Sequence, residues 1–133
     1  MIKQFEDFLE GVVKDALIGS PFEVEKNASD YSVLATLANT SKPRAFVRFI
    51  SASFSPSGVK AAPYTQTYSY EIVLCVANAK THQVCYEPIE NIINALRIAR
   101  FGNIFPILTS VNPIERGASI AMYGINLNLT IKE

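Results

Sequence analysis

The chain has 133 residues, of which 49% are hydrophobic and 18% are charged, and its formal net charge is zero. This balance is typical of a folded domain with a hydrophobic core and excludes an intrinsically disordered chain. A general nucleic-acid binder would carry an excess of Lys and Arg to neutralise phosphates, and this composition has none. We therefore expect a single domain over residues 1–133.

The charges are distributed unevenly along the chain. Residues 1–30 carry three lysines against seven acids, a net charge of −4, whereas residues 42–116 carry eight basic residues against four acids, a net charge of +4. Complementary charges on the two parts would suit head-to-tail association of identical subunits. Random scatter of solvated charges is the simpler alternative.

The N-terminus carries acids where a secretory signal would have a long apolar segment. No apolar run approaches the length of a membrane span. We therefore expect a cytosolic protein that does not enter membranes, with Cys75 and Cys85 reduced.

Residues 2–18 have the pattern of an amphipathic helix. Apolar side chains such as Phe5 and Leu9 recur at helical spacing, and acids and lysines occupy the other side. Gly19 and Pro21 mark the end of this helix. Phenylalanines on its apolar stripe indicate that the helix covers a sheet.

Two short elements are expected next. Residues 21–26 alternate apolar and charged side chains, which predicts a short strand near a sheet edge. Residues 27–40 are ambiguous between a helix and a loop. A helix capped by Asp30 is the interpretation that we favour.

The most regular segment of the chain is 64–77, YTQTYSYEIVLCVA, around which we expect the fold to be organised. Its alternation and its Tyr, Thr, Ile and Val content predict a β-strand. One face is polar up to Glu71 and apolar from Val73, whereas the other face is largely apolar throughout. We therefore expect residues 64–69 to form an exposed arm and the second half to lie in the core.

A second strong strand is predicted over residues 44–54, RAFVRFISASF, with Phe46, Ile50 and Phe54 on one face. Residues 55–63, SPSGVKAAP, have the composition of a loop. The two strands that flank this loop most simply form an antiparallel pair. Extra length at a hairpin tip is often functional.

The last third of the chain predicts one helix and two strands. Residues 86–100 have a helical apolar stripe, and residues 104–111 and 118–131 have strand patterns. In the final strand the apolar positions change from even to odd numbers near Gly124, which predicts a β-bulge or bend there. The fold class is therefore α+β, with an antiparallel or mixed sheet of four to five strands covered by the N-terminal helix and the 86–100 helix.

No catalytic or cofactor-binding motif is found in the sequence. Cys75, His82 and Cys85 lack the fourth ligand and the closely spaced pairs of a structural zinc site. A Cys85–His82 nucleophile pair is conceivable, but the two residues are too close in sequence to face each other readily. We expect no enzyme activity, no metal and no cofactor.

The aromatic residues allow two interpretations. The tyrosines of segment 64–70 and the phenylalanines of segment 46–54 could stack on bases, as in sheet-based RNA binders. Little basic charge accompanies them, apart from Arg44 and Arg48. Core packing or a protein interface is the better explanation, so we expect no direct nucleic-acid recognition.

The order of these elements resembles the tail terminator and tail-completion proteins of long-tailed phages and Mu-like prophages. The resemblance is carried by the helix IKQFEDFLEGVVKDAL, the strands AFVRFISASF and TYSYEIVLCVAN, the helix PIENIINALR and the closing segment SIAMYGINLNLTI. It covers nearly the whole chain and includes no catalytic motif.

The resemblance implies a homo-oligomeric ring, a hexamer in this family, that caps the tail tube and presents a face to the head–tail connector protein. Its partners would be further copies of itself, the tail tube protein and the connector. Its location would be the virion tail, reached from the host cytoplasm during assembly. A hairpin that reaches between subunits corresponds to residues 53–68. The expected oligomer or tube interface comprises Arg48, Ser57, Gly58, Lys60, Tyr64, Tyr68 and Arg116.

Two alternatives stay open at this stage. Neck, tail-tube and baseplate proteins have related folds, so another structural role in the virion fits the same pattern. A small ligand-binding or enzymatic α+β domain is the alternative of a different class.

Overall fold

The computed structural model describes residues 1–39, 42–59, 62–77, 82–114 and 120–132. Within these ranges, five strands form one sheet in the order β1-β2-β3-β5-β4. β1 pairs with β2 in parallel, and the other neighbours are antiparallel. The predicted α+β class with a mixed sheet is therefore confirmed. In chain order the elements are α1 (Ile2–Ala16), β1 (Glu23–Lys26), α2 (Tyr31–Asn39), β2 (Arg44–Val59), β3 (Ala62–Val76), the 3-10 turn η1 (His82–Cys85), α3 (Tyr86–Ile98), β4 (Ile107–Pro113) and β5 (Ala121–Lys132).

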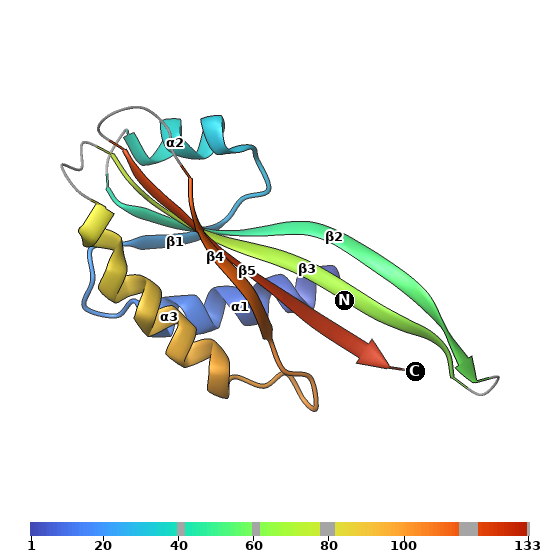
Figure 1. The fold of residues 1–133 in the computed structure, drawn as a ribbon. Coiled ribbons are helices and arrows are strands. Elements are labelled where there is room, and N and C mark those ends of the chain that lie inside the picture. The colour runs from blue at the N-terminus through green and yellow to red at the C-terminus, as the bar shows by residue number, and fades with distance from the viewer. Residues whose placement is uncertain (40–41, 60–61, 78–81, 115–119, 133) are drawn as a thin grey trace.

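The sheet is covered by helices on both faces, but unequally. Figure 1 shows α1 and α3 side by side on one face and the shorter α2 on the other, near the end of the sheet where β3 finishes. The main core lies between the sheet and the helix pair, and a smaller core lies under α2. Complete burial of a large apolar side chain such as Phe5 or Leu9 contributes about 1.5–3 kcal/mol.

The two cores explain the uneven polarity of β3. Ile72 and Leu74 enter the main core, while Val73 and Cys75 lie in the core under α2. α2 covers only one end of the sheet face on which it packs. On the uncovered part of that face, the first half of β3 therefore carries polar residues. The prediction that the second half of this strand is buried on both faces is confirmed.

The helices follow the sequence patterns closely. α1 buries Phe5, Leu9 and Val13, as its apolar stripe predicted. Gly19, just beyond its end, has a positive φ of 85° that favours glycine. At α2 the backbone N–H of Val33 donates to Asp30 Oδ1 at 3.1 Å, so the helix with an Asp30 cap is confirmed.

The predicted bulge at Gly124 is wrong. β5 pairs with β3 without interruption from Ala121 to Lys132. The change of apolar positions has another cause: Met122 faces the core under α2, while Ile125 and Leu127 face the main core. At the start of β5 both faces of the strand are buried, so apolar residues occur at even and odd positions without any change in the direction of the side chains.

Bulges occur instead in the two strands that flank the central pair. The β2–β3 register shifts between Phe49 and Ser51, which leaves Ile50 unpaired, and the β4–β5 register shifts between Leu108 and Ser110. The Ile50 bulge moves Ala52 onto the same face as Phe49, so the predicted alternation of residues 44–54 fails beyond this point.

The loop predicted over residues 55–63 is wrong for the described residues. β2 continues to Val59, β3 begins at Ala62, and these two residues are themselves paired. Pro56 is accommodated opposite Tyr64 in the strand pair. Residues 78–81, between β3 and η1, lie outside the described residues.

Candidate assembly interface

The main candidate for an interface is the outer part of the β2–β3 hairpin. β3 pairs with β5 only as far as Thr65, so residues 56–59 and 62–64 form a two-stranded ribbon beyond the sheet. Figure 1 shows this ribbon, the arm, projecting past the rest of the chain. The arm therefore starts near Thr65, further out than the boundary near Ser69 that the sequence suggested.

The sequence-predicted interface residues fall into three groups. Ser57, Gly58 and Tyr64 have their backbones in the arm, and the structure describes no side chain for them. Lys60 and Arg116 lie outside the described residues. The two remaining residues, Arg48 and Tyr68, lie within the chain and are taken in turn below.

Arg48 belongs to a polar cluster between the sheet and α2. Its Nη1 donates to Glu71 Oε1 at 2.5 Å, and the hydroxyl of Tyr31 donates to both Glu71 oxygens at 3.0 and 2.9 Å. The Arg48 guanidinium lies 4.8 Å from the centre of the Tyr31 ring. Burial, followed by the Glu71 carboxylate, raises the pKa of Tyr31. The cluster ties α2 to the sheet, so Arg48 is already paired within its own chain.

The same cluster requires a residue without a side chain at position 124. A Cβ atom at this position would lie 3.0 Å from Glu71 Cδ and closer still to Glu71 Oε2. Glu71 is the buried charged residue of the described core, at 4% exposed. The glycine predicted to permit a bulge thus makes room for a buried carboxylate on the neighbouring strand.

Tyr68 points into the main core and is 6% exposed. Its ring packs edge-to-face against Phe5 with centres 5.2 Å apart, and its hydroxyl donates to Gln66 Oε1 at 2.8 Å. The predicted exposure of Tyr68 is therefore wrong. Tyr70 is also buried, and its hydroxyl donates to the carbonyl of Ile2. These two tyrosines are not accessible for stacking on nucleic-acid bases.

Beyond α2, the same face of the sheet carries pairs of polar side chains. Ser69 Oγ donates to Asn128 Oδ1 at 2.8 Å, and the hydroxyls of Thr67 and Thr130 lie 3.3 Å apart. These pairs satisfy one another across β3 and β5. None of these four side chains carries a positive charge.

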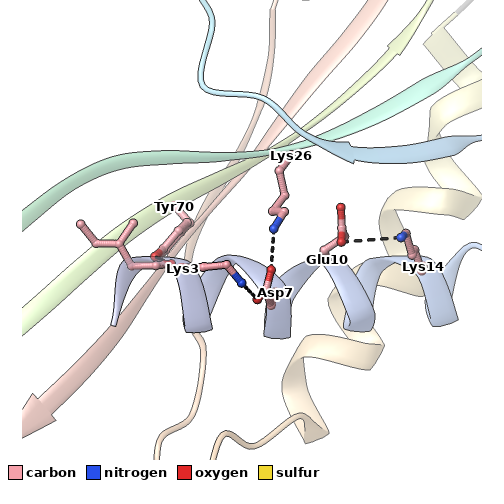
Figure 2. A network of polar contacts seen from close by, with 7 residues as sticks. Lys3, Asp7, Glu10, Lys14, Lys26 and Tyr70 are labelled. Atoms are coloured by element: carbon pink, nitrogen blue, oxygen red, sulfur yellow. Dashed lines mark hydrogen bonds and ion pairs between the residues drawn. The ribbon is translucent and has the colours of Figure 1, made fainter.

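Two acids of α1, Asp7 and Glu10, are paired within the chain. Figure 2 shows Asp7 between Lys3 and Lys26, at 2.9 and 2.5 Å, and Glu10 beside Lys14. The hydrogen bond from Lys26, together with that from Lys3, lowers the pKa of Asp7 from 3.8 to about 2. Lys26 belongs to β1, so this exposed pair joins α1 to the sheet edge.

Arg44 extends the same pattern from β2 to β1. Its Nη1 lies 2.9 Å from Glu25 Oε2, and its Nη2 lies 3.9 Å from Glu23 Oε2. Several charges that would serve a contact between subunits are therefore already matched within one copy. This leaves less support for an electrostatic origin of head-to-tail association.

The cysteines show no sign of activation. Burial raises the pKa of both the Cys75 and the Cys85 thiol to about 11, so both are protonated at neutral pH. The side chain of His82 is outside the described part of the structure. Among the described residues, no group of three or more His, Cys, Asp or Glu side chains could hold a metal ion. No described helix is both long and apolar enough to cross a membrane.

The described surface has several hollows, of which two are large. The first has a volume of about 580 Å³ and lies between the end of α1, Pro43 and the start of α3, with Glu87 as its charged lining residue. The second, about 910 Å³, lies beside the start of β4 and the end of β5 and is lined by residues 101–105, Ile107, Thr130 and Ile131. We call the second the end hollow. In the first hollow the hydroxyl of Ser20 donates to the carbonyl of Leu17, and the lining of the end hollow contains no acid, lysine or histidine.

The comparison with solved structures concerns the fold. This fold is shared with a chain of a virion. The structure is similar to a chain from the virion of a native gene transfer agent particle, with a TM-score of 0.50 and 13% identity over 94% of this chain and 95% of that chain. A protein of Akkermansia muciniphila, solved without its transmembrane region, matches with a TM-score of only 0.37 and 14% identity over 98% of this chain and 81% of that chain, too low to carry an argument. No protein-family model and no curated protein matches the chain.

Sequence reasoning missed the features that depend on distant segments. Glu71 was visible only as a polar residue within an apolar strand, and its partners Arg48 and Tyr31 are 23 and 40 residues away. The end hollow joins residues 101–107 to residues 130–131. The sequence pattern of residues 104–111 predicted only a strand and gave no sign of a hollow.

Proposed function

We propose that this protein is a structural component of a phage or phage-like particle. Within that class, we propose that it caps the tail tube as a ring and joins the tube to the head connector. The observation that carries the proposal is the arm of β2 and β3, which extends from a small α+β domain whose fold recurs in a gene transfer agent virion. An extended two-stranded ribbon has little of its own to pack against, so its natural use is contact with another subunit.

The proposed contact residues follow from this geometry. Ser57, Gly58 and Tyr64 belong to the arm by backbone position, and Lys60 and Arg116 are retained from the sequence. Arg48 and Tyr68 would act indirectly: they hold α2 and the base of the arm in place. The proposed partners are further copies in a hexameric ring, the tail tube protein and the head–tail connector protein. The proposed location is the virion tail, after assembly in the host cytoplasm.

A structural role also fits the state of the reactive side chains that the structure describes. The described cysteines are buried and protonated, and the polar cluster at Glu71 is closed off by α2. An enzymatic domain would need a hollow in which a nucleophile meets an activating group, whereas in the first hollow Glu87 is the one charged lining residue and the Ser20 hydroxyl donates to the carbonyl of Leu17. A neck, tube or baseplate protein is the alternative within the structural class.

The test is deletion of the gene from a phage or gene transfer agent genome that carries it. We expect tail tubes of abnormal length and heads without attached tails in electron micrographs, with both defects reversed by supplying the intact chain. A chain truncated in the arm, with residues 57–63 replaced by a two-residue turn, is expected to fold but not to restore attachment. Normal particles in the deletion strain would refute the proposed function.

A further inference from the structure

A row of aromatic rings crosses the molecule on the side of the sheet that faces α1. Phe54 contacts Tyr68 with ring centres 6.5 Å apart, Tyr68 contacts Phe5 at 5.2 Å, and Phe5 contacts Phe101 at 5.3 Å. All three contacts are edge-to-face, the favourable arrangement for such rings. We call these four rings the aromatic row. Its middle is buried, but Phe54 at one end is 60% exposed.

The other end of the aromatic row opens into the end hollow, because Phe101 lines it. Phe105 and Ile107, also in its lining, are 44% and 56% exposed. The guanidinium of Arg100 lies 4.3 Å from the centre of the Phe105 ring. None of the lining residues is charged. The end hollow is therefore an apolar recess of about 910 Å³ with an aromatic wall, large enough for a phenylalanine side chain and its neighbours.

The strand pairings place Phe54 and the end hollow at the same position along the strand direction. Phe54 pairs with Gln66, and Gln66 pairs in turn with Ile131, which lines the end hollow. Phe54 and Ile131 also share a face of the sheet, since Phe54 contacts Tyr68 of the main core and Ile131 packs against that core. A second copy that is displaced across the strands, with no movement along them, would thus bring its Phe54 to the end hollow of the first copy.

Both of these positions lie where a sheet edge is open. β1 covers the outer side of β2 only as far as Val47, and β4 covers β5 only from Asn128 inward, among the described residues. Residues 49–59 contain no charged residue, and in the uncovered end of β5 residues 129–131 contain none, with Lys132 beyond them. Uncharged edges with unpaired backbone groups favour pairing with another chain. Because the two edges are on opposite sides of one sheet, such a contact would be head-to-tail and could close into a ring.

We infer that Phe54 of one copy inserts into the end hollow of the next copy, so that the aromatic row continues from subunit to subunit. This inference rests on the proposed function, since it specifies how the copies of the ring meet. Aromatic residues that fill apolar pockets dominate the binding energy of protein interfaces. The end hollow supplies such a pocket, and Phe54 is a large apolar side chain already held by Tyr68.

The first test compares Phe54→Ala with Ile18→Ala, both tested on the full chain alone and on tail tubes. Ile18 is 80% exposed and lies beyond α1 outside both the arm and the end hollow, so it controls for loss of an exposed apolar side chain. We expect Phe54→Ala to weaken self-association, measured by sedimentation, by about tenfold or more. The control should associate as the wild type does, and both variants should melt cooperatively because neither position is buried.

The second test is disulfide cross-linking of Phe54→Cys combined with Asn103→Cys, an exposed position at the end hollow. The native Cys75 and Cys85 are fully buried and contribute little background. We expect a ladder of covalent oligomers in the double variant, whereas each single variant can yield dimers at most. Wild-type rings with no ladder and unchanged association of Phe54→Ala would overturn the insertion but leave the proposed function intact. A wild-type chain that neither self-associates nor binds tail tubes would overturn both.

Discussion

Replacing Glu71 by leucine should destabilise the protein strongly, although Glu71 lies far from the arm tip. Glu71 is 4% exposed and accepts hydrogen bonds from Arg48 and twice from Tyr31. Removal of the carboxylate leaves the Arg48 cation, only 14% exposed in its side chain, without a counter-charge. Breaking a buried pair in this way costs about 3–5 kcal/mol, and the residual exposure of Arg48 favours the lower end of that range.

The assay is urea unfolding followed by circular dichroism, with thermal melting as a second measure. A loss of about 3 kcal/mol should lower the melting temperature by about 10 °C for a chain of this size. The double variant Arg48→Met with Glu71→Leu should regain most of the loss, because it removes both charges together. Glu25→Gln is the matched control: Glu25 pairs with Arg44 at 2.9 Å but is 38% exposed, so its loss should cost no more than about 1 kcal/mol.

The reasoning is refuted if Glu71→Leu and Glu25→Gln destabilise the protein equally. It is also refuted if the double variant is no more stable than Glu71→Leu alone. Either result would mean that the cluster under α2 contributes through packing alone and not through the pairing of its charges.

Three further predictions follow from individual contacts. Gly124→Ala should lower the free energy of unfolding by about 2 kcal/mol or more in the same urea assay, since its Cβ atom would displace the Glu71 carboxylate; unchanged stability would show that Glu71 can move freely. The pKa of Asp7 is lowered to about 2, so the stability from its lysine pairs should be complete above pH 4 and lost as the pH falls towards 2. Asp7→Asn should remove this part of the acid dependence, and an unaltered acid titration of stability would contradict the pairing. Cys75 and Cys85, whose pKa values are raised to about 11 by burial, should not react with a thiol reagent at pH 8 until urea unfolds the chain; rapid reaction in the folded state would count against their burial.

Local patterns in the sequence predicted most of the elements. The apolar stripe of α1 and the alternation of β3 each result from burial on one side of an element, which leaves a regular period in the sequence. The cap at Asp30 predicted α2 because a single side chain satisfies a backbone N–H at a known position. These signals are local, so the sequence alone was sufficient.

The features that failed depend on neighbours in space. The bulge at Ile50 is defined by the register between β2 and β3, and neither strand shows it alone. The apparent change of face at Gly124 arose because α2 covers one end of the second face. Residues 55–59 looked like a loop because Pro and Gly are common in turns, yet each can lie in an exposed ribbon with one open side.

The candidate interface was predicted only in outline. The arm was expected from the long segment that connects the strands now seen as β2 and β3. The point where the arm begins, and the inward direction of Tyr68, became visible only in the structure. The end hollow could not have been anticipated, because it forms where the turn after α3 meets the last residues of β5.

Electron microscopy of the purified chain mixed with its tail tube protein tests the proposed function most directly. We predict a ring of six copies at one end of each tube, with the arm of every subunit against its neighbour and Phe54 in the neighbour's end hollow. Tubes whose ends stay bare at saturating concentrations of the chain would contradict the account.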